Sequence, residues 1–164
     1  MNNYCTHLCT YGIIQKVMQM NFVAKYFDEL TTSEIYEILK AREQIFLLEQ
    51  QMNCQDIDGV DYKCRHFFIE KEGSVLAYLR AFYIDDSKSA VKIGRVLTIK
   101  HGEGFGAEIM KKAIADIKQN MKCRKVCLNS QKHAVGFYEK LGFETVSDEF
   151  LEEGVLHVAM ELQI

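Results

Sequence analysis

The chain has 164 residues, of which 48% are hydrophobic and 26% are charged, and its formal net charge is −3. This length suits one domain around a single core. The charge balance argues against the basic surface of a nucleic-acid-binding protein. No apolar run approaches the roughly 20 residues of a membrane span. We therefore expect neither nucleic acid nor a membrane as a partner.

The beginning of the chain is its least regular part. Residues 1–19 mix polar residues with cysteines and lack the continuous apolar segment of a secretory signal. We expect them to form an extension before a domain of residues 20–164. The cysteines include no Cys-x-x-Cys pair, which argues against zinc, and without a signal they are expected to be reduced thiols of a cytoplasmic protein. They are Cys5, Cys9, Cys54, Cys64, Cys123 and Cys127.

The domain is predicted to begin with a strand over 21–27 and a helix over 32–50. Thr31 and Glu34 have the spacing of a capping box, in which each side chain bonds the backbone N–H of the other residue. One face of the helix should be buried, because apolar residues recur along it with approximately helical spacing. These are Ile35, Ile38, Leu39, Ile45, Phe46 and Leu48.

An acidic segment over 51–63 separates this helix from the predicted sheet. Its aspartates, at 56, 58 and 61, allow a calcium interpretation. A calcium loop, however, needs further alternating oxygen ligands and a closing glutamate between two helices, which this segment lacks. An acidic turn is therefore favoured over a metal site. It could supply the partner that Arg80, in a largely apolar strand, would need if buried.

The rest of the chain alternates strand and helix patterns. Strands over 65–70, 75–83 and 90–99, separated by turn residues, should form an antiparallel meander. A helix over 104–121, a strand over 125–128, a helix over 134–141 and a strand over 155–162 complete the order. The predicted fold class is α/β, with a mixed, largely antiparallel sheet and helices on both faces.

A turn with glycines at 102, 104 and 106 joins the strand over 90–99 to the next helix. Its backbone N–H groups and the positive end of the helix dipole suit a phosphate or pyrophosphate. The P-loop pattern fails, because Ala107 and Glu108 stand where lysine and a hydroxyl residue are needed. A dinucleotide site would need a carboxylate after the following strand, where Asn129 and Ser130 stand. A structural turn and a coenzyme A turn remain.

The segment His101-Gly-Glu-Gly104-Phe-Gly106 resembles the [Q/R]xxGxG/A motif of the GNAT N-acetyltransferases, with histidine in place of Gln or Arg. Downstream, Asn129 and the segment from Ala134 to Phe143 resemble the second cofactor segment of that family. Residues 20–164 also resemble its ElaA-like branch. That likeness rests on Arg42-x-x-Ile-Phe46-Leu-Leu-Glu49-Gln50, Asp56-x-Asp58-Gly59-x-Asp61, Arg65-His66, Ile93-Gly94-Arg95-Val96 and Glu153-Gly154-Val-Leu-His157-Val-Ala-Met160.

This resemblance implies the GNAT fold and a site for acetyl-CoA that needs no metal. The turn would hold the pyrophosphate, and the strand at 96–98, beside a splay in the sheet, would pair with the pantetheine arm. One N–H group of that strand would polarise the acetyl carbonyl. The implied cofactor-binding residues are Val96, Leu97, Thr98, His101, Gly102, Glu103, Gly104, Phe105, Gly106, Ala107, Asn129 and Tyr138.

Acetyl transfer to an amine requires an acid for the leaving thiolate and a base for the amine proton. Tyr138 is the candidate acid, because a phenol with a pKa near 10 is protonated at neutral pH; core packing is its alternative role. The base is left open among Glu49, His66 and His157, each of which also has a structural interpretation.

The predicted function is an N-acetyltransferase that moves an acetyl group from acetyl-CoA to a primary amine by direct attack in a ternary complex. A non-catalytic acyl-CoA-binding or sensing module is the alternative, and a nucleotide-binding oxidoreductase is disfavoured by the missing ribose contact. Small molecules and peptides are both open as acceptors, and the acidic turn favours a cationic amine. The oligomeric state is open, and the resemblance offers a homodimer as one alternative, because members of the family often dimerise.

Overall fold

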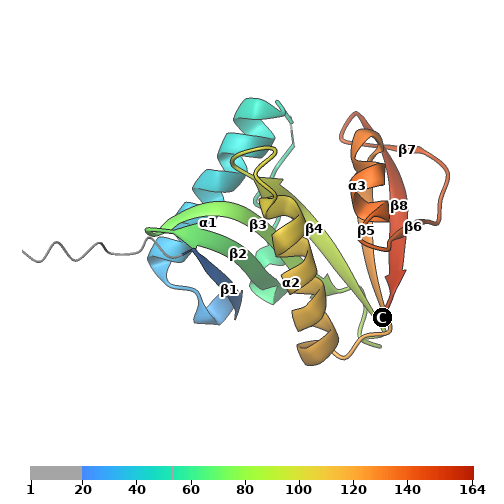
Figure 1. The fold of residues 1–164 in the computed structure, drawn as a ribbon, viewed down its shortest axis with the longest axis horizontal. Helices are drawn as coiled ribbons and strands as arrows, with labels where there is room; N and C mark the ends of the chain where they lie inside the picture. Colours follow the sequence, from blue (N-terminus) through green and yellow to red (C-terminus); the bar gives the residue numbers. More distant parts are fainter. Residues whose placement is uncertain (1–19, 53) are drawn as a thin grey trace, which may run out of the picture.

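The computed structural model describes residues 20–52 and 54–164, which fold around one mixed sheet (Figure 1). The strand order is β1-β2-β3-β4-β5-β8-β6, and β7 also pairs with β8. Within the described residues β4 and β5 form the one parallel pair. The predicted mixed, largely antiparallel sheet is thus confirmed. Its strands are β1 (Asn21–Tyr26), β2 (Arg65–Lys71), β3 (Ser74–Tyr83), β4 (Ala90–Thr98), β5 (Lys125–Gln131), β6 (Glu144–Thr145), β7 (Phe150–Glu152) and β8 (Val155–Gln163).

The predicted meander is the central part of the sheet. β2, β3 and β4 follow one another in antiparallel order, and a tight turn at residues 72–73 joins the first two. β5 continues to Gln131, three residues beyond its predicted end, because it pairs with β8 along its whole length. The predicted extension, residues 1–19, lies outside the described residues.

Two helices cover one face of the sheet, α2 (Phe105–Asn120) and the short α3 (Val135–Glu139) (Figure 1). α2 is amphipathic, and its apolar side chains at 109, 110, 113 and 117 are fully buried in the main core. Burial of each larger side chain stabilises the fold by about 1.5–3 kcal/mol. α3 adds Tyr138 to the same core, so it docks on the sheet beside the end of β5.

The other face is covered by α1 (Thr32–Arg42), where Thr31 and Glu34 form the predicted capping box. Ile38 packs with Tyr78 of β3 in a second, smaller core. The prediction of one regular helix over 32–50 was wrong beyond Arg42, because the chain continues there as a π-helix, Glu43–Glu49. Its wider turns break the 3.6-residue period, so Leu48, expected on the buried face, is 67% exposed.

Several short elements have no strong sequence period and were not predicted. They include 3₁₀ turns at Phe27–Glu29 and Val60–Lys63 and the strands β6 and β7. The helix predicted over 134–141 is split into a 3₁₀ turn, Lys132–Ala134, and α3. Elements of two to five residues carry too few apolar positions for periodicity to identify them.

Candidate active site

The sheet opens between β4 and β5. The two strands pair only over Ala90–Lys92 and Lys125–Cys127, although β4 continues to Thr98 and β5 to Gln131. Beyond these pairs the strands diverge, and Figure 1 shows β4 and β5 separating from the end marked C toward the top of the picture. Within the described residues no strand therefore pairs with the β5-facing edge of Val96–Thr98. An extended ligand could hydrogen-bond to this edge as an added strand would.

A β-bulge in β4 lies at this opening. Arg95 and Val96 together stand opposite the single residue Leu79 of β3, between the pairs Arg80↔Gly94 and Tyr78↔Leu97. Arg95 has φ +55°, in the left-handed region that an L-residue rarely adopts. Such bulges bend a strand and re-aim its side chains, so the bulge turns the end of β4 away from β5.

The side chain of Arg95 ties the bulge to the α1 face. Its Nε donates to Asp56 Oδ1 at 2.6 Å, and an Nη group lies 3.3 Å from Asp58 Oδ2. The guanidinium carbon lies 6.0 Å from the ring centre of Phe46. Two segments remote in sequence, the π-helix and the acidic turn, thus hold the bulge in place.

The glycine turn has the backbone geometry of an anion cradle. Gly102 and Gly104 have φ of +79° and +84°, and no atom lies within 4 Å of a side chain built on either. Gly104 precedes the first residue of α2 and supplies no capping side chain, so the first N–H groups of a 16-residue helix face open space. These residues fit a pyrophosphate.

Gly106 has a different role in the turn. A Cβ there would lie 3.6 Å from both the Phe137 ring and the Thr98 methyl group. A side chain at this position would therefore face α3 and the end of β4 and not open space. The turn, the diverging end of β4 and α3 consequently meet in one place, as the sequence prediction required.

His101, at the first position of the turn, pairs with Glu49 from the end of the π-helix. Its Nε2 lies 2.8 Å from Glu49 Oε1, and both side chains are exposed. The predicted base Glu49 thus faces the predicted pyrophosphate ligand His101, and a bound anion would compete with its carboxylate.

Tyr138 is largely buried, with 8% of its surface exposed. It lies edge-on to Phe137 and Phe143, with ring centres 5.0 and 6.0 Å away. Burial raises the pKa of Tyr138 to about 12, because the charged phenolate is poorly solvated there. The hydroxyl accepts and donates no hydrogen bond to the described protein residues. It is therefore protonated and free to donate to a ligand.

His157 of β8 is largely buried, with 6% of its surface exposed, and the ring of Phe150 stacks on it with ring centres 6.2 Å apart. His157 is paired with Gln131 of β5, and because side chains alternate along a strand, Asn129 shares its face of the sheet. The carbonyl of Val155 lies 2.9 Å from His157 Nδ1 and can only accept, so Nδ1 carries the hydrogen. In the neutral ring the lone pair then sits on Nε2, as a proton acceptor requires.

Asn129 itself donates from Nδ2 to Glu152 Oε2 at 3.0 Å. The side chain of Asn129, which was predicted to contact the cofactor, thus hydrogen-bonds to the β7–β8 hairpin in this structure. Its amide carbonyl oxygen has no partner among the described residues. Asn129 retains one acceptor for a ligand in the opening.

His66 has both ring nitrogens engaged. Nε2 lies 3.0 Å from the carbonyl of Asp61, and Nδ1 lies 2.9 Å from the hydroxyl of Tyr78. Burial lowers the pKa of His66, outweighing the hydrogen bond to the carbonyl, which favours the charged form. With no free lone pair, the neutral ring is a structural element of the α1 face.

The acidic turn is neutralised by arginines from three different elements, Arg42 of α1, Arg80 of β3 and Arg95 of β4. The expected pairing of Arg80 is therefore confirmed, at 2.5 Å to Asp58 and 2.8 Å to Asp61. Burial alone would raise the pKa of Asp58, but hydrogen bonds from Arg80 and the Val60 N–H hold it well below its usual range. With its charges matched, the turn gives little support to a cationic acceptor.

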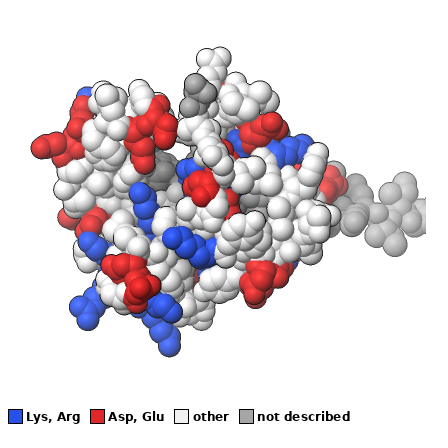
Figure 2. All heavy atoms as spheres, turned by 180° about the vertical axis from the view of Figure 1, so that it is seen from behind, with Lys and Arg blue, Asp and Glu red and all other residues white. Residues whose placement is uncertain are grey.

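The face that carries these side chains is opposite to the one in Figure 1. Acidic and basic groups are interspersed over it and form no broad area of one sign (Figure 2). Across residues 20–52 and 54–164 no three His, Cys, Asp or Glu side chains gather as metal ligands would. None of the helices there combines the length and apolar character of a membrane span, and the four described cysteines are free thiols.

The structure thus brings together most of the predicted site. Val96–Thr98, the turn over 101–107 and Tyr138 meet around the end of β4, and Glu49 reaches the turn. His66 lies elsewhere, at the start of β2. Sequence reasoning assigned no role to Arg95, although the motif Ile93–Val96 contained it; the positive φ that makes it a bulge residue has no signal in the residue type.

Comparison with known proteins finds relatives that match most of the chain. The family model described as "Acetyltransferase (GNAT) domain" matches residues 48–164. A UPF0039 protein of Schizosaccharomyces pombe is 34% identical over 149 residues, which cover 88% of this chain and 98% of the relative. The protein ElaA of Escherichia coli is 32% identical over 143 residues, covering 85% of this chain and 94% of ElaA.

Solved structures agree over nearly the same range. The crystal structure of Escherichia coli ElaA has a TM-score of 0.82 at 31% identity and covers 88% of this chain and 99% of its own. An acyl-CoA N-acyltransferase from Pseudomonas aeruginosa has a TM-score of 0.80 at 30% identity, with the same coverage. The similarity therefore includes both the strand opening and the turn before α2.

Proposed function

The chain belongs to the GNAT acetyltransferase family, and from this premise we propose that it transfers an acetyl group from acetyl-CoA to a primary amine in a ternary complex. The cradle before α2 carries this proposal, because its open side is lined by backbone N–H groups without a capping side chain. The acceptor is a small molecule or a peptide amine that enters from the face of His157.

The donor side would be held by backbone groups more than by side chains. The N–H groups at residues 102–107 would bind the pyrophosphate, and the free edge of Val96–Thr98 would bind the pantetheine arm. Bound acetyl-CoA supplies an activated thioester, whose cleavage by an amine gives an amide and a free thiol. An N–H of the β4 edge would stabilise negative charge on the carbonyl oxygen.

Tyr138 is the proposed general acid. Its buried hydroxyl keeps its proton across the physiological pH range, since its pKa is about 12. It has no competing hydrogen bond in the described protein, and its neighbour Phe137 lies against Gly106 of the glycine turn, which supports this role. A proton held there would pass to the departing sulfur as the carbon–sulfur bond breaks.

His157 is the proposed base. Of the three candidates, it is the one whose proton-accepting nitrogen is left without a partner, since its Nδ1–H is held by Val155. Both ring nitrogens of His66 have hydrogen-bond partners within the fold, and Glu49 pairs with His101. The amine proton would move to His157 Nε2, directly or through one water.

The decisive experiment follows thiol release from acetyl-CoA with a panel of primary amines. Turnover should depend on an amine, and Tyr138→Phe should lower kcat by about 10²–10⁴-fold while CoA still binds. His157→Gln should lower kcat while CoA still binds. His133→Gln, on an exposed 3₁₀ turn, is its matched control and should behave as wild type.

The outcomes separate enzyme from sensor. CoA binding without turnover of any amine would favour a non-catalytic acyl-CoA-binding module. A wild-type kcat in His157→Gln would remove His157 from the reaction without affecting the donor assignment. Absence of CoA binding would contradict the whole proposal.

A further inference from the structure

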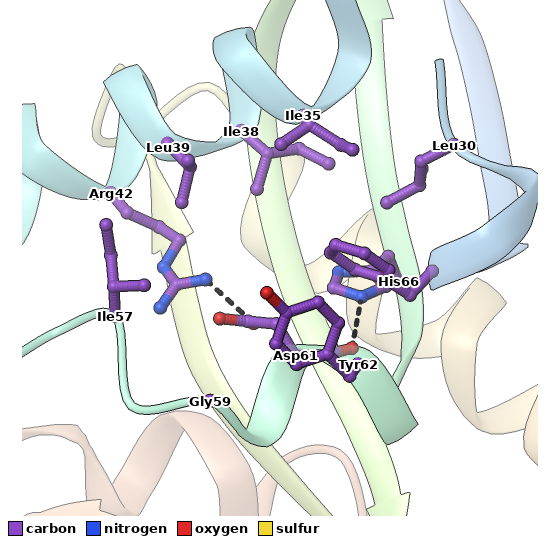
Figure 3. A pocket seen from close by; sticks show the side chains of 11 residues that line it. Leu30, Ile35, Ile38, Leu39, Arg42, Ile57, Gly59, Asp61, Tyr62 and His66 are labelled. Carbon is purple, nitrogen blue, oxygen red and sulfur yellow. Dashed lines mark hydrogen bonds and ion pairs between the residues drawn. The ribbon is translucent and has the colours of Figure 1, made fainter. Parts of the chain in front are cut away.

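A cavity of about 190 Å³ lies on the α1 face, between α1 and the segment 57–62 (Figure 3). Aliphatic side chains point into it from α1 on one side and from Ile57 on the other. Its floor is formed by Asp61 and His66. The apolar lining residues are Phe27, Leu30, Ile35, Ile38, Leu39 and Ile57.

The charged groups in the wall of this cavity are already paired with one another. Arg42 donates from Nη1 to Asp61 Oδ1 at 2.8 Å and from Nε to Asp56 at 2.8 Å. His66 donates to the Asp61 carbonyl and bonds the Tyr78 hydroxyl (Figure 3 shows the first contact). A charged ligand would lose its hydration without gaining a partner.

Water gains few hydrogen bonds from the apolar part of this lining. A buried water needs two to four polar partners, whereas an apolar cavity of about 150 Å³ lined by Leu, Ile and Phe stays dry and binds benzene. This cavity is slightly larger and shares the Leu, Ile and Phe side chains, but it opens to solvent on one side and Asp61 lies in its floor. Two polar groups of the lining have no side-chain partner in the described residues, the hydroxyl of Tyr62 at the exposed rim and Oδ2 of Asp61, whose Oδ1 accepts from Arg42 and Arg80.

We propose that this cavity is a binding site for a small neutral apolar molecule, of the size of a single aromatic ring with one or two substituents. The ring contacts the aliphatic side chains of α1, and a single hydroxyl or similar neutral group can reach Tyr62. The site is distinct from the acyl-CoA cradle, which lies at the opposite end of β4 beyond the bulge.

The separation follows from the register of the sheet. His66 pairs with Arg80, and Arg80 pairs with Gly94, before the bulge. The paired arginines and aspartates stand between the cavity and the diverging end of β4. An occupant of the cavity would therefore neither touch nor displace CoA.

The test uses toluene as the probe and methyl NMR spectra of the full chain. Toluene should shift the methyl signals of Ile35, Ile38 and Leu39 saturably, with saturating CoA present or absent. At ten times its Kd it should raise the folding equilibrium constant about 11-fold. Benzoate, a charged molecule of similar shape, should give no saturable shift.

Ile35→Trp places a larger side chain in the cavity, and Ile84→Trp makes the same change at an exposed position away from it. Toluene binding should be lost in the first variant and kept in the second. Leu30→Trp serves if Ile35→Trp does not fold. Unsaturable shifts, equal binding of benzoate, displacement by CoA, or wild-type toluene affinity in a folded cavity variant would each overturn the proposal.

Discussion

Two glycines of the cradle differ in what surrounds them, and substituting each by alanine should have opposite effects. The Cβ of Gly104→Ala would meet nothing within 4 Å, but the residue has φ +84°. Left-handed backbone costs an L-residue about 1–2 kcal/mol, so we expect Gly104→Ala to lower the free energy of unfolding by about 1 kcal/mol. The open space is also where the anion would lie, so CoA binding should weaken at least about tenfold, or 1.4 kcal/mol.

At Gly106 the added methyl group would instead contact Phe137 and Thr98 at 3.6 Å, an ordinary van der Waals distance. Alanine is favoured over glycine in a helix by up to about 1 kcal/mol. Gly106→Ala should therefore raise the free energy of unfolding by about 0.5 kcal/mol. Its methyl group faces protein and not ligand, so CoA affinity should stay within about twofold of wild type.

Gly154→Ala separates backbone strain from ligand contact. Gly154 has φ +79° and an equally open Cβ position, but it lies in the β7–β8 turn. Gly154→Ala should lower the free energy of unfolding about as much as Gly104→Ala does and should leave CoA affinity unchanged. Urea unfolding gives the stability and isothermal titration calorimetry gives the affinity. Wild-type CoA affinity in Gly104→Ala would contradict the assignment of the cradle to the N–H groups before α2. A larger loss of CoA affinity in Gly106→Ala than in Gly104→Ala would contradict it as well.

Three other substitutions test the charges and the acid. The protonated phenol of Tyr138 stabilises the fold below its unfolded pKa of about 10, and this contribution is lost as pH rises toward the folded pKa of about 12. The free energy of unfolding should therefore depend less on pH across this alkaline range in Tyr138→Phe than in the wild type. Asp58, whose pKa is lowered beside Arg80, stabilises the fold above about pH 4, and this contribution is lost as pH falls. Asp58→Asn should have a lower free energy of unfolding than the wild type at neutral pH, and this free energy should depend less on pH in acid. Arginine is charged at every pH, so His101→Arg should tighten CoA binding several-fold at low salt; equal affinities would remove position 101 from the site.

The parts of the fold that sequence predicted are those specified by nearby residues. α2 was identified because Ile109, Ala113 and Ile117 recur with helical spacing and Gly104 precedes them. The same local signals found the meander and the capping box at Thr31. Family resemblance then supplied the cofactor segments, which the structure brings together at the end of β4.

The parts that sequence missed depend on contacts between distant residues. Three base candidates looked equivalent, and the structure separates His66 from His157 by the partners of their ring nitrogens. The bulge at Arg95 depends on its pairing with Asp56, 39 residues away. No residue-type pattern encodes that a non-glycine residue takes φ +55°. The π-helix after Arg42 likewise gave the signal of an ordinary helix.

The position of Arg95 also explains how donor and acceptor sides can be held in register. Its backbone forms the bulge that turns the end of β4 away from β5, and its side chain contacts Asp56 and Phe46 on the acceptor-facing side. A loose loop there would let the β4 edge and the acceptor wall move independently. Catalysis loses rate steeply when reacting groups are misplaced by even 1 Å, so ion pairs among three elements favour a fixed opening. The matched charges of the acidic turn are thus explained by their contacts to this edge, and in the proposed reaction the side chains around His157 would recognise the amine.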